Sequence, residues 1–196
     1  VFHVSARTVS THALNIFGDH SDVMACRQTG FAMLCEGNVQ EVMDLSPVAH
    51  LAALSGKVPF INFFDGFRTS HEIQKIAVWD YEDLKDMCDM DAVAEFRRHA
   101  LNPEHPHMRG SHENGDIFFQ HREACNKYYA ELPAVVEKYM DLVNAKLGTD
   151  YKLFNYYGHP EADRVIVAMG SICDVAEEVI DYLNAHGEKV GLVKVR

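Results

Sequence analysis

The sequence predicts an α/β protein with a mostly parallel sheet. Short apolar runs alternate along the chain with segments whose apolar residues recur every three or four positions, the pattern of strands joined by covering helices. The run at 58–64 is almost continuously apolar, which is typical of a parallel strand covered on both faces. It ends in Asp65-Gly66, and polar residues at such a strand end commonly belong to a binding site.

The first elements are a strand and a connection rich in turn residues. We expect a strand over residues 1–4, followed by a polar, helix-compatible segment over 8–17. Residues 18–22 read Gly-Asp-His-Ser-Asp, and these residue types favour turns and helix caps. The short apolar run at 23–26 is then predicted to be the second strand.

A long helix is predicted to begin at Asn38. Glu41 lies three residues later, as in a capping box, and apolar residues share one face as far as residue 53. Pro47 lies within this pattern and is expected to kink or restart the helix. After the strand at 58–64, the Thr-Ser pair predicts a capped helix over 69–76.

The middle of the chain is predicted to contain helices around one long connection. We expect a short helix over 91–100 and a longer amphipathic helix over 133–147. Between them, residues 101–120 hold two prolines, two glycines and many polar side chains. This composition predicts a long loop or arm.

The C-terminal part reads as a separate unit. Residues 164–168 and 190–195 are strand-like, and the helical segment between them stops at Gly187. A right-handed parallel crossover is the expected connection. We place a domain boundary near residue 152, which gives a first domain over 1–151 and a second over 152–196.

Composition argues against several classes of function. The formal net charge of −11 over 196 residues argues against nucleic-acid binding, because a phosphate backbone needs a basic face. No apolar run approaches the roughly 20 residues that cross a bilayer, and the first residues do not resemble a secretion signal. We therefore expect a cytoplasmic protein without membrane contact. The five cysteines contain no Cys-x-x-Cys pair, so they predict neither a zinc ribbon nor an iron-sulfur cluster in this chain.

Two further features concern metals and completeness. His105, His107 and His112 lie in the 101–120 segment, but no His-Glu-x-x-His motif accompanies them, and we predict no metal site. The chain begins without methionine in a strand-like segment and stops in another. Since natural domains rarely do so, we expect a piece of a longer protein.

A series of motifs resembles one known family. Residues 58–76 read V-P-F-I-N-F-F-D-G-F-R-T-S-H-E-I-Q-K-I and closely resemble a segment of the pyruvate:ferredoxin (flavodoxin) oxidoreductases. The resemblance covers essentially the whole chain, in order. The other motifs that carry it are V-F-H-V-S-A-R at 1–7, I-F-G-D-H-S-D-V-M at 16–24, R-Q-T-G-F-A-M-L at 27–34, L-N-P-E-H-P at 101–106, R-V-I-V-A-M-G-S at 164–171 and G-E-K-V-G-L-V-K-V-R at 187–196.

The resemblance implies a thiamine-diphosphate enzyme. Such enzymes convert pyruvate and coenzyme A to acetyl-CoA and CO2, and pass electrons through [4Fe-4S] clusters to ferredoxin or flavodoxin. Residues 1–151 would be the distal part of the pyrimidine-type thiamine-diphosphate domain, and 152–196 the beginning of an α/β domain resembling the transketolase C-terminal domain. The remaining domains of the same polypeptide would hold the diphosphate, Mg²⁺ and clusters, and a homodimer is expected.

The same resemblance assigns roles to two residues. The arginine that closes the V-S-A-R segment holds the substrate carboxylate in this family, and Arg7 occupies that position. Ile16 would line the small pocket for the methyl end of the 2-oxoacid; from the residues alone it would be a core residue, and the two roles do not exclude each other. The family's catalytic glutamate lies upstream of Val1, so we expect no catalytic residue here and no cofactor binding to this chain alone.

Other polar residues are weaker candidates. Asp65, Arg68, His71 and Glu72 follow the apolar run and could form a polar cluster, although the Arg68 and Glu72 spacing also fits a simple helix-surface pair. The turn at 170–171 could bind an anion through free backbone N–H groups. Arg27 could lower the pKa of the Cys26 thiol, but a buried, inert cysteine is the simpler interpretation. The clearest departure from the family pattern is Cys35-Glu36-Gly37, where small residues are expected.

Two alternative functions stay open at this point. One is a 2-oxoacid:ferredoxin oxidoreductase that takes a larger substrate, since several residues facing Ile16 lie outside the chain. The other is a non-catalytic α/β binding module that has kept the fold and lost the chemistry.

Overall fold

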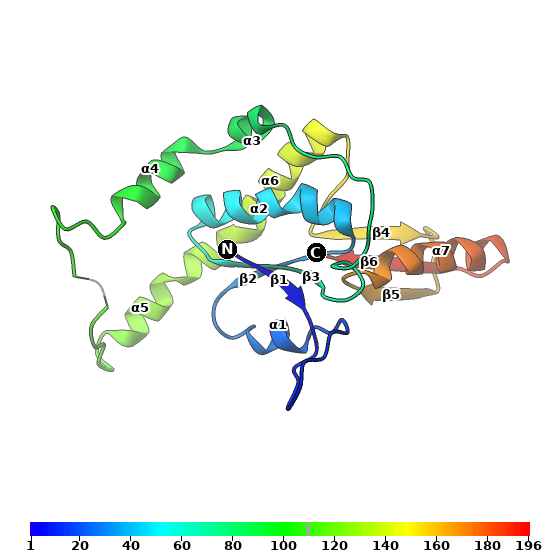
Figure 1. The fold of residues 1–196 in the computed structure, drawn as a ribbon, viewed down its shortest axis with the longest axis horizontal. Helices are drawn as coiled ribbons and strands as arrows, with labels where there is room; N and C mark the ends of the chain where they lie inside the picture. Colours follow the sequence, from blue (N-terminus) through cyan, green and yellow to red (C-terminus); the bar gives the residue numbers. More distant parts are fainter. Residues whose placement is uncertain (109) are drawn as a thin grey trace.

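A computed structural model describes residues 1–108 and 110–196. It contains two three-stranded sheets; helices pack on both faces of the first sheet, and helix α7, Ile172–Ala185, packs on the second (Figure 1). The predicted α/β class is therefore confirmed. In chain order the elements are β1 Phe2–Ala6, α1 Ser21–Ala25, β2 Ala32–Glu36, α2 Val39–Gly56, β3 Phe60–Asp65, α3 Tyr81–Met87, α4 Met90–Arg98, α5 Phe118–Ala124, α6 Asn126–Leu147, β4 Phe154–Gly158, β5 Arg164–Ala168, α7 Ile172–Ala185 and β6 Val190–Val195.

The first sheet is parallel and has the order β1-β3-β2, with β3 in the centre. Helix α2 covers one face and packs in turn against α6, and the short helix α1 covers the other face (Figure 1). Because β3 is buried on both sides, its sequence is nearly all apolar. The main core lies between this sheet, α2 and α6, and its largest fully buried side chains include Phe60, Leu34, Leu45, Tyr139 and Met140.

Helix α2 begins where the sequence predicts. The side chain of Asn38 accepts a hydrogen bond from the Glu41 backbone N–H at 2.9 Å, which satisfies one of the free donors of the first turn. The Glu41 carboxylate reaches back to the N–H of Gly37, at 2.8 Å, one residue before the cap. Pro47 lies inside the helix, which continues through it to Gly56.

The second sheet has the order β4-β6-β5 and is mixed. β6 is parallel to β5 and antiparallel to β4. Helix α7 connects β5 to β6 and packs on the sheet through Cys173 and Ile180, which confirms the predicted strand-helix-strand unit. Strand β4 was not predicted as a strand; its tyrosine-rich sequence is only half buried and has no continuous apolar run.

Two predicted elements are wrong. Residues 23–26 lie in and just after α1, and Val23 alone is buried there; the second strand is instead β2, at Ala32–Glu36. Residues 69–76 form a turn and then an extended segment. Tertiary contacts hold this segment along α2, because the Gln40 side chain bonds both the N–H and the C=O of Ala77, at 2.9 and 3.1 Å.

The helix-compatible segment at 8–17 is also not helical, and α3 was not predicted. The expected arm at 101–120 is mostly without regular structure where it is described, but α5 begins inside it at Phe118. Helix α6 begins at Asn126, before the predicted start at 133, and carries Pro133 within it. No helix of the described residues is long and apolar enough to cross a bilayer.

Candidate functional site

The candidate site lies at the carboxyl ends of β1 and β3. These strands are paired so that Ala6 lies opposite Asp65, and the N–H of Gly66 donates to the Ala6 carbonyl at 2.8 Å. Arg7 follows β1 directly and therefore leaves the sheet beside Gly66. A side chain at position 66 would bring its Cβ within 2.5 Å of the Ala6 carbonyl oxygen, so only glycine allows this close approach.

The Arg7 guanidinium is held by the backbone. Its Nε and Nη2 donate to the Gly66 carbonyl at 3.3 and 2.9 Å, and its own backbone N–H donates to Asp22 Oδ2 at 2.9 Å. Arg7 also forms an isolated bridge with Gly18. The carbonyl uses two of the five guanidinium N–H donors, which leaves three for a ligand. Within the described part of the chain, no carboxylate forms an ion pair with Arg7.

Asp65, the last residue of β3, is the centre of a second set of contacts. Its Oδ1 lies 2.5 Å from His20 Nε2, and its Oδ2 accepts hydrogen bonds from the backbone N–H and hydroxyl of Ser171, at 2.8 and 2.5 Å. Burial by itself would raise the pKa of Asp65, but the bonds from His20 and Ser171 lower it to about 2. The hydrogen bond to Asp65 correspondingly raises the pKa of His20.

Ile16 lies close to this site along the chain. It precedes Phe17 and Gly18, and Gly18 is the residue that bridges to Arg7. The Ile16 side chain is 41% exposed, and residues 8–17 line a hollow of about 680 Å³. It is therefore not a core residue in this structure. Its assignment to a substrate pocket stays a prediction.

The structure does not assemble the four-residue cluster considered after β3. Asp65 turns to His20 and Ser171, whereas His71 contacts Ser70, at 2.9 Å, and the ring of Phe67. Since residues 69–76 are not helical, the helix-surface pair of Arg68 and Glu72 does not form.

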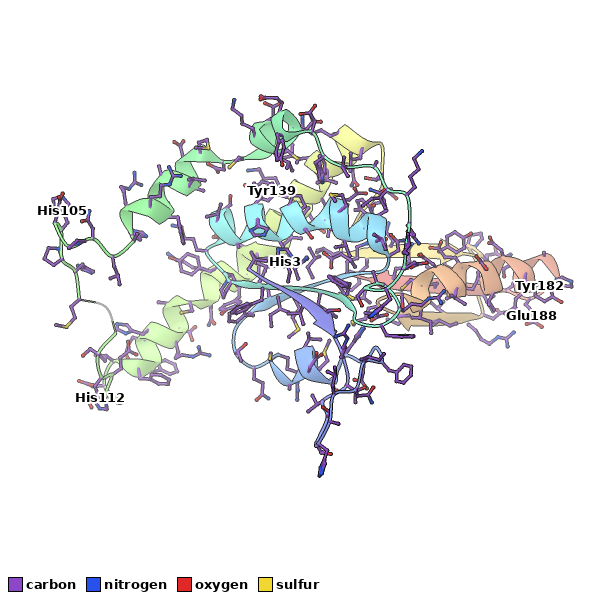
Figure 2. The ribbon with its side chains drawn as sticks, viewed as in Figure 1. His3, His105, His112, Tyr139, Tyr182 and Glu188 are labelled. Carbon is purple, nitrogen blue, oxygen red and sulfur yellow. The ribbon has the colours of Figure 1, made fainter. Side chains whose placement is uncertain are left out.

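The structure also shows the contacts of the weaker candidates. The turn at 170–171 does bind an anion, but that anion is the Asp65 carboxylate of the same chain. Arg27 donates to the Met24 carbonyl at 2.8 Å. His105 and His112 lie on the arm that projects from the first sheet (Figure 2), and no group of three or more metal-ligating side chains occurs among the described residues.

A second polar feature lies under α2. Glu36 is fully buried at the end of β2, and neither of its carboxyl oxygens has a hydrogen-bond partner in the described residues. Burial raises its pKa well above 4.5, and Asn62 is the side chain that faces it. Asn62 in turn contacts His3 Nδ1 at 3.0 Å, and His3 Nε2 lies 2.9 Å from His50 Nε2.

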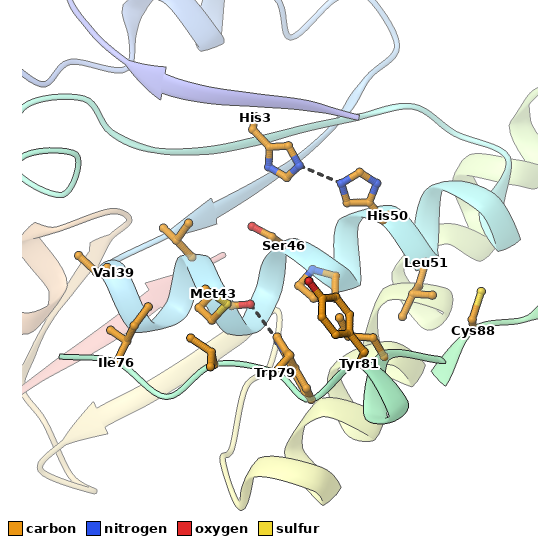
Figure 3. A pocket seen from close by; sticks show the side chains of 14 residues that line it. His3, Val39, Met43, Ser46, His50, Leu51, Ile76, Trp79, Tyr81 and Cys88 are labelled. Atoms are coloured by element: carbon orange, nitrogen blue, oxygen red, sulfur yellow. Dashed lines mark hydrogen bonds between the residues drawn. The ribbon is translucent and has the colours of Figure 1, made fainter. Parts of the chain in front are cut away.

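The two imidazoles border a cavity of about 810 Å³ (Figure 3). Its walls are α2 and the extended segment that runs into α3, where Trp79 Nε1 donates to the Met43 carbonyl at 2.9 Å. The sequence indicated this buried polar group in one way, because Glu36 stands where the family pattern has a small residue.

At the first site, the sequence did not indicate the role of His20 beyond its place in a Gly-Asp-His turn.

A parallel sheet with helices on both faces defines an α/β domain, and the fixed arginine at its carboxyl edge has the chemistry to bind an anionic group. The comparisons then give the family. The family described as pyruvate flavodoxin/ferredoxin oxidoreductase, thiamine diphosphate-binding, matches residues 1–141, and pyruvate:ferredoxin oxidoreductase core domain II matches residues 162–196. The chain belongs to the pyruvate flavodoxin/ferredoxin oxidoreductase family.

Curated relatives agree with this assignment. The chain is 62% identical to a pyruvate-flavodoxin oxidoreductase of Enterobacter agglomerans, 63% to one of Klebsiella pneumoniae and 62% to a pyruvate:ferredoxin oxidoreductase of Moorella thermoacetica. All of this chain is covered in each alignment, but only 17% of each relative, so it spans about a sixth of their length.

The fold also has a solved counterpart. A 2-oxoglutarate:ferredoxin oxidoreductase from Magnetococcus marinus superposes with a TM-score of 0.53 over 96% of this chain and 35% of that chain, at 19% identity. This likeness supports the fold.

Proposed function

We propose that this chain is a segment of a pyruvate:ferredoxin or pyruvate:flavodoxin oxidoreductase. The reaction converts pyruvate, coenzyme A and two oxidised one-electron carriers to acetyl-CoA, CO2, a proton and two reduced carriers. Membership of the family and the identity to full-length relatives support this proposal. The single structural observation that carries it is the Arg7 guanidinium, fixed at a sheet edge with three donors free for a carboxylate.

In the proposed mechanism Arg7 binds and orients the substrate. Its planar donors match a carboxylate, and its attachment to Gly66 fixes their direction before the substrate arrives. Ile16 would face the methyl end of pyruvate. Thiamine diphosphate, when bound, supplies the electron sink for decarboxylation. The described residues include no metal-ligating cluster, and in this proposal Mg²⁺, the diphosphate and the [4Fe-4S] clusters are held by other domains of the polypeptide.

The organisation of the parent protein is part of the same proposal. We place the domain boundary between residues 151 and 152; two separate sheets and two separate family matches support a boundary in this region. A homodimer in the cytoplasm is proposed from the family resemblance. Light scattering on the intact enzyme tests the dimer.

Substitution of Arg7 in the intact enzyme tests the function. Arg7→Ala should lower kcat/KM for pyruvate by roughly two to three orders of magnitude, because a charge-assisted carboxylate contact of about 3–4 kcal/mol is lost. Thiamine-diphosphate affinity should change little. Arg27→Ala, at an exposed arginine away from Arg7, is the matched control and should keep normal kinetics. Near-normal kinetics in Arg7→Ala would show that this residue does not bind the substrate. If the wild-type enzyme has a higher kcat/KM for a larger 2-oxoacid than for pyruvate, that 2-oxoacid replaces pyruvate in the proposal.

A further inference from the structure

The Asp65 carboxylate joins three parts of the chain that are distant in sequence. It ends β3, its Oδ1 contacts His20 in the turn after Ile16, and its Oδ2 contacts Ser171 at the start of α7 in the second unit. Each oxygen therefore serves a different partner. Ordinary helix capping needs only one of these contacts, so capping does not explain the pairing with His20.

The turn held by Asp65 is the one that supports Arg7. Two attachments hold the Arg7 backbone. One is the bridge to Gly18, in which the Phe17 carbonyl accepts from the Thr8 N–H at 3.4 Å, and the other is Asp22, which accepts from the Arg7 N–H. His20 lies between these two attachments, and its ring packs edge-on against Phe63 at 5.3 Å between centroids. A displacement of His20 would therefore move both attachments of the Arg7 backbone.

In the second unit, the Gly170-Ser171 turn that bonds Asp65 is closely packed. Gly170 has a φ of +82°, and a Cβ there would lie 2.9 Å from Asp65 Oδ2. Gly37, which follows β2, is packed so closely that its Cβ would lie 3.3 Å from the Gly170 carbonyl oxygen. The Gly170-Ser171 turn is thus seated against the first sheet at the point where Asp65 leaves it.

We propose that Asp65 is a positioning residue that transmits the seating of the second unit to the substrate-binding turn. Ser171 fixes the carboxylate, the carboxylate fixes His20, and His20 fixes the turn that supports Arg7 and carries Ile16. Substrate affinity then depends on a contact made by the neighbouring domain. This inference rests on the proposed function, since it takes Arg7 to bind the substrate.

The test is a comparison of two contacts between the units in the intact enzyme. Ser171→Ala removes one donor to Asp65 and leaves its backbone donor in place. We expect the KM for pyruvate to rise about tenfold, as for loss of a hydrogen bond to a charged group, with kcat within about twofold. Ser171→Thr keeps the hydroxyl and should restore the KM. Asp174→Ala is the matched control, because it removes another contact with the first unit, the hydrogen bond that Asp174 accepts from Asn38 Nδ2 at 3.0 Å, which does not involve the turn.

A second measurement, on the intact enzyme, separates the inference from the function. Amide hydrogen exchange followed by mass spectrometry reports the local stability of residues 16–22. Ser171→Ala should speed exchange there, whereas Asp174→Ala should not. If the wild-type enzyme does not consume pyruvate, the proposed function fails and this exchange alone decides the coupling. Unchanged exchange at residues 16–22 in Ser171→Ala, or equal effects of Asp174→Ala on the KM and the exchange, would overturn the role of Asp65.

Discussion

Replacing Glu36 by glutamine should stabilise the protein increasingly as the pH rises above 4.5, the ordinary pKa of the group. Glu36 has no exposed surface and no partner for its carboxyl oxygens among the described residues. A buried carboxylate without a partner is much less stable than the neutral acid, so the folded protein keeps the proton.

Strand register places a suitable acceptor beside that proton. Asn62 is paired with Leu34 of β2, and Glu36 lies two residues further along the same face. The Asn62 amide donates to Ser46 Oγ at 3.1 Å and to His3 Nδ1, which leaves its Oδ1 free to accept. Neutral Glu36 can donate a hydrogen bond to this oxygen, which would give a partner to one Glu36 carboxyl oxygen and to Asn62 Oδ1, both buried without one among the described residues.

The magnitude follows from proton linkage. The unfolded chain ionises Glu36 near the ordinary pKa, whereas the folded chain keeps it protonated, so unfolding releases a proton. Above pH 4.5 the free energy of unfolding of the wild type therefore falls relative to Glu36→Gln by up to about 1.4 kcal/mol per pH unit. The difference stops growing once the pH passes the raised pKa of the folded state.

Urea unfolding of this chain at several pH values from 5 to about 8 measures that slope. Glutamine has the size of glutamate and keeps an N–H that can donate to Asn62. The two proteins therefore differ only in the titration of Glu36. Glu41→Gln is the matched control, because the Glu41 carboxylate pairs with Arg196 at 2.6 Å and accepts from Gly37; that variant should lose stability at neutral pH. A difference between wild type and Glu36→Gln that is constant with pH, or that favours the wild type as pH rises, would refute the reasoning.

Three further outcomes are expected. Gly170→Ala should lower the free energy of unfolding by at least about 1–2 kcal/mol, and by more than the control Gly187→Ala does. Both glycines have φ above +80°, but only a Cβ at Gly170 would meet a close neighbour. Urea unfolding of the two variants measures the difference. The pair with Asp65 raises the pKa of His20, so wild type should have a larger free energy of unfolding than His20→Asn. This difference should be full below pH 6.5 and be lost as the pH rises through the folded pKa of His20. Free energies of unfolding that change with pH in the same way in both proteins would contradict this. Calorimetric titration of this chain with thiamine diphosphate and Mg²⁺ should give no saturable heat at micromolar concentrations, and micromolar affinity would mean that the cofactor site is misplaced.

The sequence predicted the elements whose local pattern and tertiary role agree. β3 is apolar because it is central, and α2 starts at Asn38 because that side chain caps it. The prediction failed at 23–26 and 69–76, where tertiary contacts override a short pattern. The extended segment after β3 is held by Gln40, which lies 37 residues before Ala77 in sequence, and no local rule detects such a contact.

The candidate site was predictable in part. The family resemblance singled out Arg7, and the strand-end argument singled out Asp65. Their partners could not be predicted, because the Gly66 carbonyl, His20 and Ser171 reach them only through strand register and the packing of the second unit. Periodicity determines which residues face a core, but it does not determine which polar atoms meet across 45 or 106 residues of sequence.

Both sheets have their last strand in the middle. β3 lies between β1 and β2, and β6 lies between β4 and β5. During synthesis, therefore, β1 and β2 have no strand to pair with until residues 60–65 have left the ribosome, and β4 and β5 wait in the same way for residues 190–195. Neither sheet can begin its native pairing before its last strand is available, and until then its two outer strands expose unpaired edges on which a chaperone or another nascent chain can act.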